Sequence, residues 1–152
     1  MAKELELTAR QKTLLVFLGS DHQPELDPVR VMKGLFLISV ETPGRWLKQE
    51  SRYQFEPYTY GPCSFEIYSD LDQLGKWGYV TSKEAPGRSW RYYALSPRGK
   101  ELARRVAEAM NRETVRYFKD VRDFVATTSF RQLLSVIYHH YPAYAVNSVF
   151  KL

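Results

Sequence analysis

The sequence predicts a mainly α-helical chain with one small β-hairpin, an α+β fold, and three observations support this prediction. Apolar residues recur every three or four positions in several segments of the 152-residue chain, as they do on the buried face of a helix. Two helix-start signals place a capping side chain directly before a proline, at Asp27 and at Ser96. Two short runs rich in aromatic residues flank a Pro-Gly turn between positions 79 and 95, which is typical of a hairpin.

Two helices are predicted in the first part of the chain. Thr8 is a suitable cap for the first helix, which ends near Gly19. Asp27 caps the second helix, which we expect to run to about Val40 because a Thr-Pro-Gly turn follows. The expected core positions of the two helices are Leu14, Leu15, Phe17, Leu18, Val31, Met32, Leu35 and Ile38.

The next segment is polar at first and then aromatic. Residues 45–52 are expected to form a loop or a frayed turn, and residues 53–60 form an aromatic stretch. Pro57 within that stretch excludes a central strand, so we expect an edge strand or an ordered loop. A third helix is predicted to start at Gly61 and Pro62 and to end at the glycines after position 74. Its expected core positions are Ile67, Leu71 and Leu74.

A hairpin and a long helix are predicted to follow. Residues 79–81 and 90–95 are the two expected strands, and residues 83–88 form the turn between them. Ser96 then caps a helix whose apolar positions continue to about Val125. At roughly 1.5 Å per residue this helix would measure about 40 Å. Part of its apolar stripe would therefore need a surface outside the domain.

Two shorter helices complete the prediction. Ser129 caps one, and Pro142 opens a last short helix that ends near Phe150. Three helices, a hairpin and a further helix follow the order of a winged helix-turn-helix domain. We therefore expect a winged-helix domain over residues 1–96 and a C-terminal helical extension over residues 97–152, which would serve dimerisation or partner binding.

Several stretches also resemble a known family. They are Phe55-Glu56-Pro57-Tyr58-Thr59-Tyr60-Gly61-Pro62-Cys63-Ser64, Ile67-Tyr68-Ser69-Asp70-Leu71-Asp72-Gln73-Leu74, Trp77-Gly78-Tyr79-Val80 and Met32-Lys33-Gly34-Leu35-Phe36-Leu37. With these stretches the chain resembles the prokaryotic YwgA-like and SocA-antitoxin-like (Panacea) group over roughly residues 10–97, and residues 131–152 are similar to tails of some members. Gly34 and Cys63 depart from the group's pattern toward small residues. The resemblance implies a winged-helix-like fold and, for antitoxin members, neutralisation of a partner toxin.

Composition favours a cytoplasmic protein that does not enter a membrane. Cys63 is the single cysteine and cannot form an internal disulfide. The start of the chain has no signal-peptide pattern, and its apolar runs are too short to cross a bilayer. The formal net charge is +5. Residues 1–96 hold twelve basic and twelve acidic residues, so the whole excess lies in residues 97–152.

Double-stranded DNA is one predicted partner, because winged helices most often bind it. The third helix would offer Ser64, Ser69, Gln73 and Lys76 to the major groove, and the hairpin would offer Lys83, Arg88, Trp90 and Arg91 to the phosphates. On the same helix Glu66 and Asp70 would repel phosphates. Alternatively, the basic residues of the hairpin form a solubilising surface and Trp90 packs inward. The basic residues between Arg98 and Arg116 would then form a solvated helix face.

A protein partner is the alternative prediction. The candidate contact residues are Tyr58, Tyr60, Met110, Tyr117, Val121 and Phe124. Tyrosine is enriched at protein interfaces, although the aromatic stretch would equally form the wall of a core. On this hypothesis the chain is an antitoxin or an adaptor, whereas on the DNA hypothesis it is a transcriptional regulator. A homodimer is expected, with the C-terminal helices as its interface.

No catalytic or metal-binding pattern stands out. Cys63 has no histidine near it in sequence, so a structural cysteine is the better interpretation than a nucleophile. His139 and His140 are adjacent and would point in different directions on a helix. We therefore expect no enzymatic activity, no cofactor and no metal. The sequence favours a DNA-binding transcriptional regulator, with the antitoxin or adaptor function as the alternative.

Overall fold

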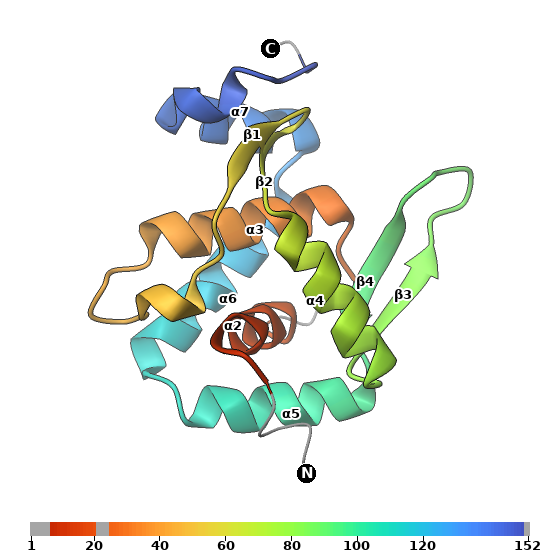
Figure 1. Ribbon diagram of the computed structural model, residues 1–152, viewed down its shortest axis with the longest axis vertical. Helices are drawn as coiled ribbons and strands as arrows, with labels where there is room; N and C mark the ends of the chain where they lie inside the picture. Colours follow the sequence, from red (N-terminus) through yellow and green to blue (C-terminus); the bar gives the residue numbers. More distant parts are fainter. Residues whose placement is uncertain (1–6, 21–24, 151–152) are drawn as a thin grey trace.

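A computed structural model describes residues 7–20 and 25–150 and shows a mostly helical α+β fold with two small antiparallel sheets. Helix α2 lies at the centre, with α3, α4, α5 and α6 packed around it (Figure 1). The helices are α2 (Ala9–Leu18), α3 (Pro28–Glu41), α4 (Phe65–Lys76), α5 (Pro97–Glu108), α6 (Arg112–Thr127) and α7 (Phe130–His140), with 3-10 turns η1 (Gln49–Ser51) and η2 (Pro142–Ala145). The strands are β1 (Glu56–Tyr58), β2 (Gly61–Cys63), β3 (Val80–Glu84) and β4 (Arg91–Leu95).

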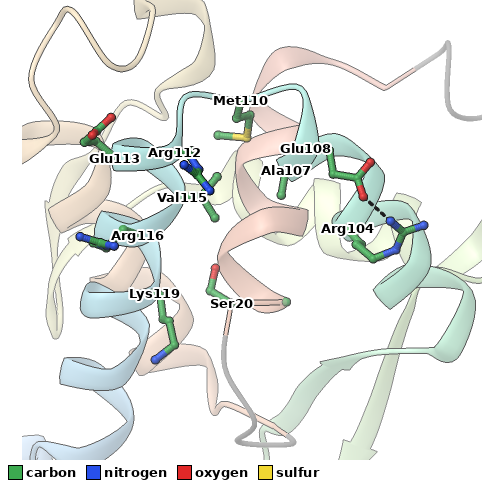
Figure 2. A pocket seen from close by; sticks show the side chains of 11 residues that line it. Ser20, Arg104, Ala107, Glu108, Met110, Arg112, Glu113, Val115, Arg116 and Lys119 are labelled. Atoms are coloured by element: carbon green, nitrogen blue, oxygen red, sulfur yellow. Dashed lines mark hydrogen bonds and ion pairs between the residues drawn. The ribbon is translucent and has the colours of Figure 1, made fainter.

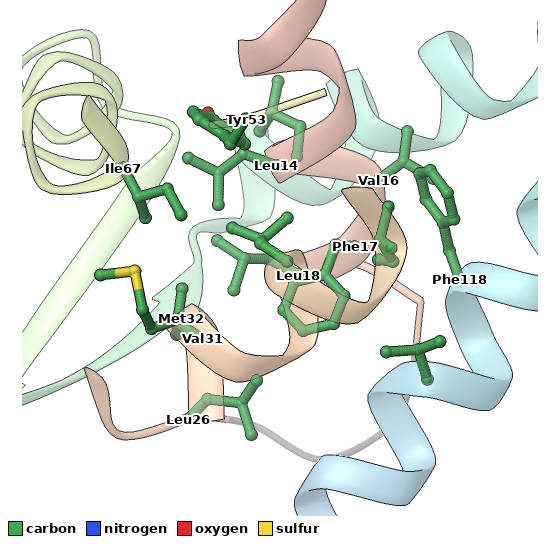
Figure 3. Packing of buried hydrophobic residues seen from close by; sticks show 14 of the residues in the cluster. Leu14, Val16, Phe17, Leu18, Leu26, Val31, Met32, Tyr53, Ile67 and Phe118 are labelled. Carbon is green, nitrogen blue, oxygen red and sulfur yellow. The ribbon is translucent and has the colours of Figure 1, made fainter. Parts of the chain in front are cut away.

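The second half of helix α2 is buried on every side, which explains its unbroken apolar run from Leu14 to Leu18. Leu14, Leu15 and Phe17 have no exposed surface, and α2 side chains lie between those of α3, α4 and α6 (Figure 3). The Thr8 side chain accepts a hydrogen bond from the Gln11 amide, and the Gln11 side-chain oxygen accepts one from the Thr8 amide. This capping box confirms the predicted start of the helix.

Helix α3 crosses α2 closely and also holds the end of α6. A Cβ atom on Gly34 would lie 2.3 Å from Cζ of Phe17, so only glycine allows this approach without a shift of the ring. At the N-terminal end of α3 the Asp27 carboxylate accepts a hydrogen bond from the Arg30 amide and caps the helix. The Arg30 guanidinium donates hydrogen bonds to the carbonyl groups of Val125 (2.9 Å) and Thr128 (3.0 Å). These carbonyls lie at the C-terminal end of α6. The last carbonyl groups of a helix have no N–H donor within the helix, so they need a donor from elsewhere.

The prediction of one long helix from Ser96 to Val125 is wrong. Helix α5 ends at Glu108, and the Asn111 side chain caps α6 by accepting hydrogen bonds from the Glu113 and Thr114 amides. The chain turns there, so α5 packs on α2 while α6 packs on α2 and α3. The apolar stripe that seemed to need an outside surface is largely covered by the chain itself. The predicted boundary at residue 96 does not divide the core, because residues on both sides share one hydrophobic cluster.

A second hairpin occupies the place where the third helix was predicted to begin. Strands β1 and β2 pair in antiparallel register, with Tyr58 opposite Gly61 and Glu56 opposite Cys63. Gly61 has a φ of +90°, a conformation that suits glycine in a tight turn. Helix α4 starts only at Phe65, so Cys63 ends a strand and does not lie inside a helix. The predicted core positions of this helix, Ile67, Leu71 and Leu74, are buried and confirm its orientation.

The predicted hairpin after α4 is confirmed. Strands β3 and β4 pair from Val80 with Leu95 to Glu84 with Arg91, and the hairpin projects from the body beside α4 (Figure 1). Trp90 precedes β4 and lies in the turn. At the C-terminal end only the 3-10 turn Pro142–Ala145 forms, so the expected helix to Phe150 is wrong. In the described part of the chain, no helix is both long and apolar enough to span a bilayer.

Candidate functional site

Four exposed aromatic side chains gather around one small pocket. Tyr58 and Tyr60 belong to the β1–β2 hairpin, and Phe65 and Tyr68 belong to the first turn of α4. Their exposed fractions are 48%, 44%, 55% and 39%. The pocket between these side chains and α3 has a volume of about 140 Å³. We call it the aromatic pocket; large apolar groups exposed together often mark a binding surface.

The hairpin that carries two of these tyrosines is held from behind by the C-terminal segment. A Cβ atom on Gly61 would lie 2.9 Å from the Tyr138 ring, so β2 rests directly on α7. The Val149 amide donates to the Thr59 carbonyl at 2.9 Å, and the Asn147 side chain donates to the Pro57 carbonyl at 3.2 Å. The β1–β2 hairpin, which forms one wall of the aromatic pocket, is therefore held in place by α7 and by residues 147–149.

Contacts between the rings fix the walls further. The Tyr58 and Phe65 rings meet edge to face, with centroids 5.2 Å apart. Tyr60 meets the Phe130 ring of α7 in the same way at 5.7 Å, and Phe130 meets Phe150 at 5.1 Å. Edge-to-face pairs of this kind contribute about 0.5–1.5 kcal/mol beyond the burial of area. These ring contacts hold the walls of the pocket in place within the chain itself.

A buried lysine lies on the α3 side of the aromatic pocket. Only 3% of Lys33 is exposed, and its ammonium donates a 2.9 Å hydrogen bond to the Pro62 carbonyl. Loss of hydration lowers the pKa of Lys33 to about 8, and the Cys63 thiol opposes this effect. No carboxylate of the described residues forms an ion pair with it. A cation that is buried without a counter-ion is unfavourable, which makes Lys33 the most unusual charged group near the pocket.

Cys63 also lines the pocket, and its surroundings favour the neutral thiol. Partial burial raises the pKa of the Cys63 thiol more than the Lys33 cation lowers it. A thiolate nucleophile needs the opposite shift. The thiol therefore contributes polarisable surface to the pocket wall.

The structure separates the residues predicted to bind DNA into three groups. Ser64 is a wrong prediction, because it is 5% exposed and lies beneath the start of α4. Ser69, Gln73 and Lys76 lie on the outer side of α4, and the Lys76 ammonium is 3.3 Å from the Asp72 carboxylate. The hairpin residues Lys83, Arg88, Trp90 and Arg91 lie together near the tip of β3 and β4.

Acidic neighbours offset much of this basic surface. The Lys83 ammonium lies 3.8 Å from the Glu25 carboxylate, and the Arg91 guanidinium lies 3.5 Å from the Glu84 carboxylate. Arg88 is exposed and has no ion-pair partner among the described residues. Trp90 is half-buried against the edge of the Tyr92 ring, at 4.9 Å between centroids. The predicted outward orientation of Asp70 is wrong, because its carboxylate is buried.

The residues predicted to bind a protein partner are also divided. Tyr58 and Tyr60 are exposed and line the aromatic pocket. Val121 is a wrong prediction, because α6 turns it into the core, where it is 6% exposed. Met110, Tyr117 and Phe124 are half-buried against the same core. The break between α5 and α6 causes this difference, since it lets both helices fold back on α2 and α3.

A wider groove opens between the end of α2, α5 and α6 (Figure 2). Its volume is about 850 Å³, and Met110 lies at its upper end. Arg112 and Arg116 line one side and make no ion pair with described residues, whereas Arg104 on the opposite side bonds to Glu108. This groove combines charged and apolar groups, and none of the described residues that line it is a buried polar residue.

Sequence reasoning missed Lys33, Phe65 and Tyr68. One signal for Lys33 was present, because it is the only charged residue between Val31 and Val40, in a run that is otherwise apolar or small apart from one serine. A charge at such a position is buried wherever the helix is covered on both sides. Phe65 and Tyr68 carried no comparable signal, because their exposure depends on the hairpin that precedes α4.

Comparison with known protein families, with curated proteins and with solved structures finds no match. Membership of the antitoxin-like group therefore stays a prediction. The geometry of the aromatic pocket and the charges around the β3–β4 hairpin are the observations that bear on function.

Proposed function

We propose that this chain is a non-enzymatic protein-binding module that holds a segment of a partner polypeptide in the aromatic pocket. The cluster of Tyr58, Tyr60, Phe65 and Tyr68 around a preformed cavity is the observation that carries the proposal. Tyrosine and phenylalanine are enriched where proteins bind one another, and rings fixed in advance lose little conformational entropy on binding. An adaptor or an antitoxin would use such a surface.

The charge pattern of α4 and of the β3–β4 hairpin supports a protein partner over DNA. Binding to a duplex depends on bases that are free to neutralise phosphates. Lys76, Lys83 and Arg91 instead lie beside carboxylates. Glu66 is 46% exposed on the same helix and binds Arg10. These carboxylates would weaken the approach of a phosphate backbone.

Site-specific photocrosslinking tests the proposal. A benzophenone amino acid is placed at Tyr58 in cells of the organism from which the sequence comes, and a matched chain carries it at Lys100, which is exposed on α5. Helix α5 and the β1–β2 hairpin lie toward opposite ends of the molecule (Figure 1). We expect one discrete protein adduct from position 58 and none of that mass from position 100. Phe65→Ala should reduce the position-58 adduct by at least about fivefold, because it removes one wall of the pocket. Equal adducts from both positions, or no adduct at position 58, contradict the proposal.

DNA-binding regulation is a second candidate. The observation that favours it is Arg88, which is exposed in the turn of the projecting β3–β4 hairpin (Figure 1) and has no ion-pair partner within the described ranges. A gel shift with mixed-sequence duplex at rising salt tests it, because phosphate-driven affinity falls steeply with ionic strength. The regulator hypothesis requires a shift at low salt that the double variant Arg88→Ala, Arg91→Ala abolishes. The absence of a shift at low salt removes this candidate.

A further inference from the structure

We infer that the partner segment presents an aromatic or large aliphatic side chain beside a carboxylate, and that the carboxylate pairs with Lys33 in the aromatic pocket. This inference rests on the proposed protein-binding function and names the chemistry of the partner.

Charge is the first reason. The Lys33 ammonium has one hydrogen-bond acceptor, the Pro62 carbonyl, and can donate three bonds. No described carboxylate pairs with it, and the side chain is 3% exposed. A methionine would fill similar space without the cost of burying a charge. An anion brought by a partner would give this cation the counter-ion that residues 7–20 and 25–150 do not provide.

Size is the second reason. The aromatic pocket has a volume of about 140 Å³. Apolar cavities of roughly 150 Å³ hold a benzene molecule. One ring or one leucine-sized side chain therefore fills the pocket, and a second large group has no room.

The walls and the lysine together exclude other ligands of similar size. Aromatic rings such as Tyr58 and Phe65 can attract a cation, but Lys33 lines the same pocket and repels one. A phosphate group is bound best by several donors or by the two-pronged guanidinium of arginine, whereas Lys33 is the single cation among the described residues that line this pocket. A monoanionic carboxylate attached to an apolar group matches both features.

A pair of small probes tests this chemistry on the full chain. The first is 3-phenylpropionate, and the second is 3-phenylpropanamide, which has the same shape without the charge. Binding is followed by the NMR shifts of backbone amides in residues 58–68. We expect the carboxylate to bind with a Kd on the order of millimolar, typical of a fragment of this size, and at least about fivefold more tightly than the amide.

Lys33→Met identifies the group responsible, with Lys100→Met as the matched control. The preference for the carboxylate should disappear in Lys33→Met while the amide still binds, which also shows that the variant folds. Lys100→Met should keep the full preference. Equal binding of both probes to the unchanged protein overturns the inference, as does a preference that survives in Lys33→Met.

Failure of this inference is distinguishable from failure of the proposed function. If neither probe binds, the pocket does not accept a ring and the inference is overturned. Crosslinking from Tyr58 does not depend on the charge of Lys33 and reports separately on partner binding.

Discussion

The Tyr53 hydroxyl donates a 2.7 Å hydrogen bond to the Asp70 carboxylate and so joins the segment before β1 to α4. The Gln11 side chain of α2 donates to the other carboxylate oxygen at 3.2 Å. Burial raises the pKa of Asp70, and burial together with the Asp70 charge raises the pKa of Tyr53. This network fixes α4, which carries one side of the aromatic pocket, against the central helix.

Tyr53→Phe should lower the free energy of unfolding by about 1–3 kcal/mol, because the buried Asp70 carboxylate loses its shorter hydrogen bond. Urea denaturation measures the change. Tyr92→Phe is the matched control, since no hydrogen bond of the Tyr92 hydroxyl is seen among the described residues, and it should cost less than about 0.5 kcal/mol. Equal losses in the two variants would show that the Tyr53 hydroxyl has no special role.

Gly34→Ala should destabilise the protein by about 1–3 kcal/mol, although alanine is the better helix former by about 1 kcal/mol. The added Cβ would lie 2.3 Å from Cζ of the buried Phe17 ring. Thermal unfolding measures the loss. Phe17→Leu in the same chain should offset part of it, because the double change relieves the clash. Gly44→Ala is the control, since a Cβ there meets nothing within 4 Å. If Gly34→Ala left the free energy of unfolding unchanged or raised it, α2 and α3 would be able to move apart and admit the added Cβ at no cost.

Arg30→Met should loosen the junction of α6 and α7. The change removes hydrogen bonds to the Val125 and Thr128 carbonyls while it keeps much of the apolar stem. We expect a loss of stability of about 1–3 kcal/mol and faster hydrogen exchange at the amides near the end of α6. Arg131→Met is the control, because that exposed side chain lies over the Phe150 ring and makes no hydrogen bond or ion pair seen among the described residues. Unchanged exchange in Arg30→Met would contradict this function of Arg30.

Lys33→Met should stabilise the protein at pH 7 and lose this advantage as the pH rises. The pKa of Lys33 falls from 10.5 to about 8 on folding, which corresponds to roughly 3 kcal/mol of unfavourable burial while the lysine is charged. Between those two pH values the unfolded chain binds the proton and the folded chain does not. The free energy of unfolding of the unchanged protein therefore rises with pH across this window.

Methionine does not titrate, so the difference between Lys33→Met and the unchanged protein should shrink from pH 8 to pH 10.5. Urea denaturation at pH 7, 8.5 and 10 measures it, and taking the difference between the two proteins removes the contributions of the tyrosines. Lys100→Met should show no such trend, because Lys100 is exposed. A constant difference across this range would mean that Lys33 titrates as it does in water.

Much of the local structure could be predicted because it depends on residues close in the chain. The predicted caps Thr8, Asp27, Ser96 and Ser129 all accept the expected backbone hydrogen bonds. A Pro-Gly turn between two short strands was enough to predict the β3–β4 hairpin. The break before α6 had a local signal as well, since Asn111 is a preferred capping residue, but the apolar spacing continues through it.

Burial and the candidate site depended on contacts between distant residues. Periodicity marks the apolar face of a helix but does not reveal what covers the other faces, so Ser64, Asp70 and Val121 were expected to be exposed. The hairpin β1–β2 forms where Gly61 and Pro62 resemble a helix start, and it is supported by α7, which lies more than 60 positions later. The aromatic pocket likewise joins Lys33 to the hairpin and to α4.

The sequence by itself determined most of the helix starts with their caps, the β3–β4 hairpin and the α+β class, because these follow from spacing and from hydrogen bonds within a few residues. Only the tertiary structure decided that Lys33 is buried with no carboxylate of the described part of the chain beside it, and that four aromatic side chains remain exposed around it. The physical reason is that exposure and charge pairing depend on which segments of the chain pack together, and that packing joins parts of the chain that are far apart in sequence.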